Sequence, residues 1–247
     1  MVAADPLDEV RVLLFDVFGT LVDWRSTVIA ELQTTGDRLG LTTDWEDLAD
    51  RWRGRYQPSM AEVREGRRPY LSLDVLHRES LVAILAEVGL DPLPDDEIDR
   101  LNRVWHRLQP WPDTPPGFAR LAERAELAAM SNADVVMVRA IADHAGIAWH
   151  HVFGAEPARM FKPRPEVFLH ALSALGLDPD RVMMVAAHNR DLEVTADLGL
   201  RTAFVVRPTE YGPTQTTDLT PTGPWDVVCD DLVQLADRLG AAPAHSG

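Results

Sequence analysis

The sequence predicts an α/β fold built on a doubly wound parallel sheet, with a helical segment inserted into it. Short apolar runs recur along the chain, and such runs are typical of strands that are buried on both faces. Segments of helical period separate the later runs, as crossover connections between parallel strands require. The runs lie at residues 10–15, 127–130, 182–187 and 202–206.

The first strand is expected at Val10 to Phe15, where an apolar run broken by a single arginine ends shortly before a Gly-Thr turn. Two core helices are expected at Ala133 to Ala145 and at Pro165 to Leu175, because their apolar residues recur three and four positions apart. Gly146 and Gly176 follow these segments directly and are typical helix stops.

The segment between Trp24 and Gln109 differs from the rest, because strand-like runs disappear and long amphipathic stretches replace them. Stretches of this kind predict helices that bury one face each. We therefore expect a helical insertion, with helices near residues 26–39, 44–55, 72–88 and 95–108.

A proline-rich stretch from Gln109 to Gly117 marks the end of this insertion, and its four prolines suit a hinge better than the interior of an element. Residues 208–224, rich in Thr and Pro, predict a long loop. The predicted organisation is a core over residues 1–24 and 110–247, and a helical insertion over residues 25–109.

Composition limits the partners of this chain. Its 247 residues are 46% apolar, enough for a sizeable core, and its formal net charge is −15. Such a charge repels phosphate backbones and anionic lipid, so we expect neither nucleic acid nor membrane partners. An acidic substrate would be repelled as well, so its site must concentrate positive charge locally.

A cytoplasmic location is expected from three features. Cys229 is the only cysteine, so no disulfide can form within the chain. The first ten residues contain neither the basic region nor the apolar run of a signal peptide. The longest apolar runs fall well short of the roughly 20 residues that a membrane span requires.

Polar side chains follow the predicted strands at the points where those strands end. Asp16 follows the first strand, Ser131 and Asn132 follow the next, Lys162 precedes a helix, and Asp191 lies just beyond the run at 182–187. Taken singly, each has a structural explanation, such as a helix cap or a solvated charge. In a doubly wound sheet, however, such positions converge on one edge, where ligands bind.

These motifs, in this order, resemble those of the haloacid dehalogenase superfamily, over roughly residues 10–235. That superfamily carries a strand-end Asp, a Ser or Thr after a later strand, a Lys, and a terminal acidic motif. The resemblance implies a Rossmann-like core with a helical cap over the active site.

Two departures from the superfamily pattern bear on the activity. Phosphatase members usually carry a general acid two residues after the nucleophile and a magnesium-binding acid at the start of the last motif. Phe18 and Ala187 occupy those two positions here, so the proton donor and the hard oxygen ligand are replaced. Halide leaves without a proton, so the departures match the 2-haloacid dehalogenase branch, and we expect no metal and no cofactor.

The resemblance implies hydrolytic dehalogenation of short 2-haloacids, either haloacetates or (S)-2-haloacids, through an ester on Asp16. Thr20 and Lys162 would orient and balance this nucleophile. Either Asp191 or His188 would activate the water that hydrolyses the ester, and both alternatives stay open. The expected substrate contacts are Val17, Phe18, Arg53, Ser131, Asn132 and Tyr56.

Arg53 is the arginine expected to bind the halide, with Arg51 and Arg55 as alternatives. At a period of 3.6 residues, Arg51 and Arg55 share one helix face and Arg53 points away from it. His188 replaces the more usual Asn, and its bulk and added donor would favour a small halide, so we expect activity on fluoroacetate.

Two other functions stay open from the sequence. One is a phosphatase of the same superfamily that acts on a small phosphate ester, and the other is a catalytically idle member kept for binding or regulation. A homodimer is also left open.

Overall fold

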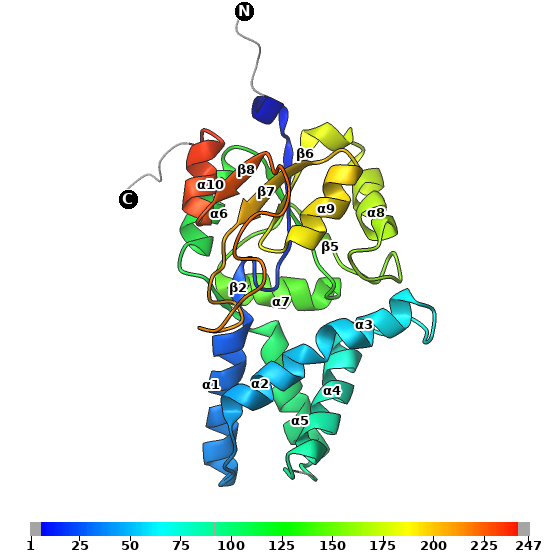
Figure 1. The fold of residues 1–247 in the computed structure, drawn as a ribbon, viewed down its shortest axis with the longest axis vertical. Helices are drawn as coiled ribbons and strands as arrows, with labels where there is room; N and C mark the ends of the chain where they lie inside the picture. The colour runs from blue at the N-terminus through cyan, green and yellow to red at the C-terminus, as the bar shows by residue number, and fades with distance from the viewer. Residues whose placement is uncertain (1–5, 91, 242–247) are drawn as a thin grey trace, which may run out of the picture.

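The computed structural model describes residues 6–90 and 92–241. Its centre is a sheet of six parallel strands in the order β5-β4-β1-β6-β7-β8 (Figure 1). The predicted doubly wound α/β fold is therefore confirmed. The strands are β1 (Val12–Phe15), β4 (Glu126–Met130), β5 (His151–Phe153), β6 (Val182–Ala186), β7 (Arg201–Val205) and β8 (Val227–Cys229).

Both faces of the sheet are buried, which explains the continuous apolar runs. Val12 and Leu14 of β1 pack with Phe168 into a cluster on one face. Leu13 and Phe15 pack into the other cluster. Helices α8 (Pro165–Leu175) and α9 (Asn189–Asp197) cover the first face, whereas α6 (Thr114–Ala122), α7 (Val135–Ala145) and α10 (Leu232–Arg238) contribute to the second (Figure 1).

The inserted segment is helical, as expected, and its helices lie together beyond one edge of the sheet (Figure 1). They pack around large buried side chains, among them Trp24, Trp52 and Trp105. The elements are α1 (Trp24–Leu39), α2 (Trp45–Gly54), α3 (Tyr56–Arg64), α4 (Leu73–Glu87), α5 (Asp95–Asn102) and a 3-10 helix (Arg103–His106).

A two-stranded antiparallel ribbon connects this helical layer to the sheet. Strand β2 (Val22–Asp23) pairs with β3 (Gln109–Pro110), so the chain leaves and re-enters the core side by side. This position agrees with the expected boundaries, but the division into two domains stays a prediction. The remaining elements are 3-10 helices at Pro6–Glu9 and Pro179–Arg181.

Part of the proline-rich stretch is helical, which corrects the expectation of a hinge over all of 109–117. Helix α6 starts at Thr114, with Pro115 and Pro116 in its first turn, where a backbone N–H has no partner within the helix. Strands β5 and β8 and helix α3 were not predicted. Each is short, and the two strands lie at the edges of the sheet, where half-exposed residues weaken the apolar pattern.

Candidate active site

The carboxyl end of the central strand β1 delivers Asp16 to the edge of the sheet that faces the helical layer. Its Oδ1 accepts a hydrogen bond from Lys162 Nζ at 2.7 Å, and Asp191 Oδ2 accepts one from the same nitrogen at 2.6 Å. Asp16, Lys162 and Asp191 are 5%, 3% and 8% exposed. A single buried ammonium thus bridges two buried carboxylates that are 175 residues apart in the chain.

Thr20 links the first motif to the fourth. Its hydroxyl donates to Asp16 Oδ2 at 2.7 Å and accepts from the backbone N–H of Ala187 at 2.9 Å. Because the Ala187 N–H fills the acceptor side of the oxygen, the hydroxyl proton points to Asp16. This contact suits the orienting role that the resemblance implied for Thr20, and that role stays a prediction.

His188 lies between two carboxylates. Its Nδ1 is 3.0 Å from Asp16 Oδ2, and its Nε2 is 3.0 Å from Oε2 and 3.2 Å from Oε1 of Glu210. The residue precedes helix α9 as its N-cap and is 20% exposed at its side chain. Both ring nitrogens therefore have a carboxylate partner within the protein.

Charges within this cluster shift the pKa values in the directions that keep it ionised. Burial alone would raise the pKa of Asp16, but Lys162 and His188 lower it well below its ordinary value. Burial would lower the pKa of Lys162, yet Asp16 and Asp191 raise it. The pKa of His188 lies well above its ordinary value, because Glu210 and Asp16 outweigh the effect of burial.

The end of helix α2 places Arg53 at the same site. Its guanidinium stacks over the Tyr56 ring at 3.9 Å from the centroid, and its Nη2 is 4.0 Å from Glu210 Oε1. The buried Nη1 has no hydrogen-bond partner among the described residues. Arg51 and Arg55 pair instead with Asp47 and Glu87 on the surface.

Three further residues that were predicted to contact the substrate come from the core. Asn132 donates to the Tyr56 hydroxyl at 3.1 Å and accepts from the Lys162 backbone N–H at 2.7 Å, so it holds both layers at the site. Ser131 is fully buried, and its hydroxyl accepts from Ala133 N at 3.1 Å. Val17 is also buried.

Most of the predicted site residues surround a cavity of about 220 Å³ between the carboxyl ends of the strands and the helical layer. Of the predicted residues, Thr20, Val17 and Ser131 do not line it, although Thr20 contacts Asp16 directly. Its wall is formed by Asp16, Phe18, Arg53, Tyr56, Gln57, Asn132, Lys162, Pro163, His188, Arg190, Asp191, Tyr211 and Asp218.

Several residues of the site were missed from the sequence: the wall residues Tyr211, Arg190 and Gln57, and Glu210, which contacts His188 without lining the cavity. Glu210 and Tyr211 lie in the Thr- and Pro-rich loop at 208–224, which has no periodic pattern and carries no motif. Arg190 stands inside the fourth motif, and Gln57 lies in the unpredicted helix α3. A charged residue within a polar loop gives no signal in sequence, because only the fold shows that Glu210 is 1% exposed.

The acidic groups at this site form a poor cradle for a divalent metal. Ligand atoms of Asp16, His188 and Asp191 lie within 4.8 Å of one another. The ammonium of Lys162, however, already contacts an oxygen of each carboxylate at 2.6–2.7 Å and would repel a second cation there. Ala187, buried beside them, supplies no ligand in place of the usual acid. The donor set does not fit magnesium.

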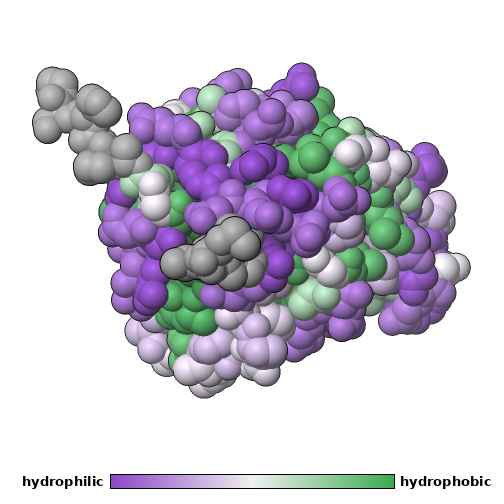
Figure 2. Space-filling model, turned by 90° about the horizontal axis from the view of Figure 1, so that it is seen from above, coloured by the Kyte–Doolittle hydropathy of each residue, from purple (hydrophilic) through white to green (hydrophobic). Residues whose placement is uncertain are grey.

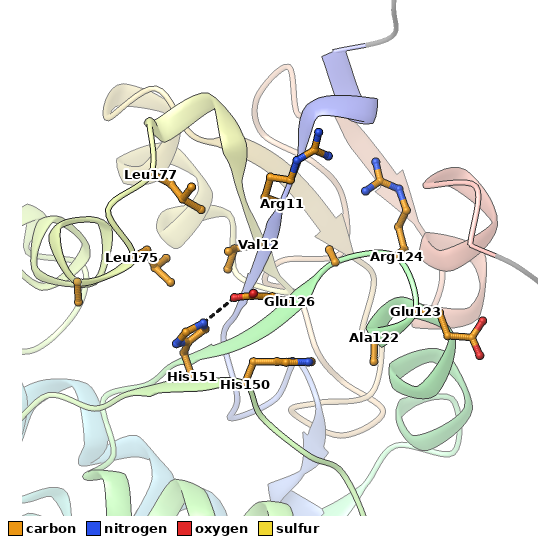
Figure 3. Close-up of a pocket in the computed structure, with 12 residues that line it drawn as sticks. Arg11, Val12, Ala122, Glu123, Arg124, Glu126, His150, His151, Leu175 and Leu177 are labelled. Atoms are coloured by element: carbon orange, nitrogen blue, oxygen red, sulfur yellow. Dashed lines mark hydrogen bonds and ion pairs between the residues drawn. The ribbon is translucent and has the colours of Figure 1, made fainter.

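A second hollow, of about 620 Å³, lies at the amino ends of the strands, opposite the ends that face the helical layer (Figure 3). Its walls include Arg11, Arg124, His150 and a surface pair in which His151 Nε2 lies 2.7 Å from Glu126 Oε2. Seen from above, the face on that side is mostly hydrophilic, with separate hydrophobic areas (Figure 2). None of the predicted catalytic residues reaches this hollow, so the chemistry belongs to the smaller cavity.

An aspartate at the end of a central parallel strand, bridged by lysine to a second aspartate, is an arrangement that suits a hydrolase. The family model of haloacid dehalogenase-like hydrolases matches residues 10–194, and the chain belongs to this family.

Its relatives within the family specify the class further. An (S)-2-haloacid dehalogenase of Xanthobacter autotrophicus is 26% identical over 200 residues, which cover 80% of this chain and 76% of that protein. A solved L-2-haloacid dehalogenase is 45% identical with a TM-score of 0.91, over 94% of this chain and 100% of the other. A solved defluorinating L-2-haloacid dehalogenase is 44% identical with a TM-score of 0.92, over 94% and 96%.

Proposed function

We propose that this enzyme hydrolyses the carbon–halogen bond of short 2-haloacids, including fluoroacetate. The observation that carries the proposal is the buried Arg53 Nη1, which has no partner among the described residues and belongs to a side chain at the wall of the cavity that holds Asp16. A buried cationic donor without a partner is costly unless an anion binds to it. A departing halide is such an anion.

The reaction proceeds in two steps. A carboxylate oxygen of Asp16 attacks the halogen-bearing carbon in line, which inverts that centre, and the halide departs with the bonding electron pair. Water then adds to the ester carbonyl of Asp16, and cleavage of the ester releases the 2-hydroxyacid and restores the carboxylate. Asp191 accepts one proton of the attacking water and returns it to the leaving alkoxide oxygen. The second proton of the water leaves the Asp16 carboxyl for the solvent, which restores the carboxylate.

The surroundings of Asp16 suit this chemistry better than phosphate transfer. Phe18 at the cavity wall cannot protonate an alkoxide leaving group, and the residues do not fit the magnesium that bridges phosphate oxygens. The substrate carboxylate binds close to Lys162, while Asn132 and Arg53 lie nearer the halide. Ser131, expected to hold this carboxylate, is fully buried and does not line the cavity. The similarity to a defluorinating dehalogenase supports the inclusion of fluoroacetate.

Halide release tests the function. The enzyme should release halide from chloroacetate and fluoroacetate and leave a generic phosphate ester intact. In heavy-oxygen water, a single turnover should place the label in Asp16 and not in the first product. Label that appears first in glycolate would mean direct attack by water, and phosphate release without halide release would make the enzyme a phosphatase.

Location and assembly are finer parts of the proposal. No described helix is long and apolar enough to cross a membrane. The proposed cytoplasmic location is supported by the single buried Cys229, which is free among the described residues. The homodimer stays a prediction that analytical ultracentrifugation would test.

A further inference from the structure

Glu210 is a buried carboxylate for which the two-step reaction above has no role. It is 1% exposed, and donors from three other segments converge on it. Trp24 Nε1 donates to Oε1 at 3.2 Å, His188 Nε2 lies 3.0 Å from Oε2, and Arg53 Nη2 is 4.0 Å from Oε1. A buried carboxylate with this many partners is a specific part of the site and not an incidental surface charge.

The first motif leaves space for Glu210, and two anchored residues hold its loop in this place. Gly19 has a φ of +80°, and a Cβ at that position would lie 2.1 Å from Glu210 Oε1, so the first motif leaves room for this carboxylate. Arg207, three residues before Glu210, binds Asp113 through both terminal nitrogens at 2.7 and 2.8 Å. Asn189 anchors the far part of the loop through Asp218, Thr220, Thr222 and Trp225.

The hydrogen bonds of Asp16 distinguish its two oxygens. A carboxylate oxygen has two lone pairs in the carboxylate plane. Oδ2 uses both, because Thr20 donates at 2.7 Å and His188 Nδ1 lies at 3.0 Å. Oδ1 contacts Lys162 alone among these donors, so it retains a lone pair for attack. Oδ2 then becomes the carbonyl oxygen of the ester.

We propose that Glu210 is a positioning residue for ester hydrolysis. It holds the His188 ring so that Nδ1–H donates to Asp16 Oδ2, and this N–H and the Thr20 hydroxyl together form the oxyanion hole of the hydrolytic step. Water adds to Cγ of the ester, Asp191 takes its proton, and the negative charge develops on Oδ2 between these two donors. The inference rests on the proposed function, since it requires the ester on Asp16.

The charges around His188 explain why Glu210 matters in this step. The ring faces Asp16 from the end of β1 and Glu210 and Tyr211 from the loop, with Lys162 and Asp191 beyond Asp16 and Arg53 beyond Glu210. Asp16 loses its charge when the ester forms. Glu210 is then the direct carboxylate partner that keeps the ring protonated against the effect of burial, which lowers a histidine pKa.

The test compares Glu210→Gln with the parent enzyme in rapid-quench experiments on chloroacetate, with Glu123→Gln as the matched control. Glu123 is exposed at the opposite edge of the sheet, and its substitution makes the same change in net charge. Glu210→Gln should release one equivalent of chloride at close to the parent rate. Its ester should then hydrolyse at least about tenfold more slowly and accumulate as an adduct visible by intact-protein mass spectrometry.

The pH profile separates this role from a merely structural one. In Glu210→Gln, the pKa of His188 should fall, so ester hydrolysis should decline at a lower pH than in the parent and partly recover under mildly acidic conditions. Glu210→Asp should restore part of the hydrolytic rate. Imidazole nitrogen shifts of labelled His188 should show a protonated ring at neutral pH in the parent and not in Glu210→Gln.

Three outcomes would overturn the inference: unchanged ester hydrolysis in Glu210→Gln, an equal fall of both steps without adduct, or an unshifted pH profile. If Glu210→Gln does not fold, His188→Gln must accumulate the same ester instead, and its failure to do so is equally decisive. A parent enzyme that releases no halide would refute the proposed function itself, so the two failures are distinguishable.

Discussion

At the scale of single residues, the site depends on one ammonium. Lys162 is the only lysine in the sequence, and it contacts both Asp16 and Asp191. Two buried carboxylates this close would otherwise repel each other, and one of them would take up a proton. Lys162 therefore helps to keep Asp16 anionic, which its proposed role as nucleophile requires.

Lys162→Met should slow formation of the Asp16 ester by roughly 100-fold or more at neutral pH, or about 2.7 kcal/mol. Burial then dominates and raises the pKa of Asp16, so the acidic limb of the rate profile should move to higher pH and activity should partly return under alkaline conditions. Single-turnover rates against pH measure this. Arg164→Met, which removes an exposed cation paired with Glu166, should leave the profile in place.

The sequence left His188 two roles, as a base for ester hydrolysis or as a donor to the halide, and its contacts in the structure suit a role in hydrolysis better. Both ring nitrogens face carboxylates, so neither N–H is free for a halide. Fluoroacetate and chloroacetate form the same ester on Asp16. His188→Asn should therefore slow ester hydrolysis equally for both, by on the order of 1 to 3 kcal/mol if one charged hydrogen bond is lost. A larger loss on fluoroacetate turnover would return His188 to the halide site.

At the scale of elements, helix α2 brings Arg53 to the cavity that the residues at the carboxyl ends of the strands form. Trp52 is fully buried, and it fixes the rotation of α2 so that Arg53 faces the cavity while Arg51 and Arg55 remain outside. The guanidinium stacks on Tyr56, which in turn accepts from Asn132 of the core. The position of α2 therefore determines where Arg53, the proposed halide ligand, lies in the cavity.

Arg53→Met should weaken bromide binding by about 10- to 100-fold, because one charged donor to the ion is removed. Inhibition of turnover by added bromide measures the change, and kcat/KM for bromoacetate should fall with it. Arg51→Met is the matched control, because this exposed arginine on the same helix pairs with Asp47. Equal bromide inhibition in the Arg53 variant and the parent would place the halide elsewhere.

At the scale of the whole molecule, a chain with a formal charge of −15 gathers cations at one cavity. Arg53, Lys162, Arg190 and His188 line the same wall, where they oppose the carboxylates of Asp16, Asp191 and Asp218. This arrangement agrees with the expectation that an acidic substrate needs local positive charge. A metal cation is disfavoured here, since the Lys162 ammonium already contacts both aspartates and would repel it.

Turnover should be unaffected by chelation. Halide release from chloroacetate should proceed at the same rate in EDTA as in magnesium. Neither addition should change the melting temperature, because only an ion that binds the folded state would raise it. Loss of halide release in EDTA that magnesium restores would contradict this prediction. A melting temperature that rises with magnesium alone would reveal a structural cation site.

The sequence by itself determined the parallel α/β core and most of the residues that meet at the candidate site. Buried strands leave continuous apolar runs, and Asp16 and Asp191 come shortly after two of them, so the convergence of these carboxylates follows from the topology of a parallel sheet. Lys162, which precedes a helix, was joined to them by the resemblance. The exchange of acids for Phe18 and Ala187 is also visible without any structure. These are local patterns, and local patterns can be read from the sequence alone.

Only the tertiary structure decided how the site is completed. Glu210 lies in a loop without periodicity, and it becomes a buried partner of His188 only because Arg207 and Asn189 fold that loop back over the first motif. The choice of Arg53 over its neighbours required the packing of Trp52. Contacts between residues far apart in the chain depend on how whole elements pack, and no spacing in the sequence encodes them.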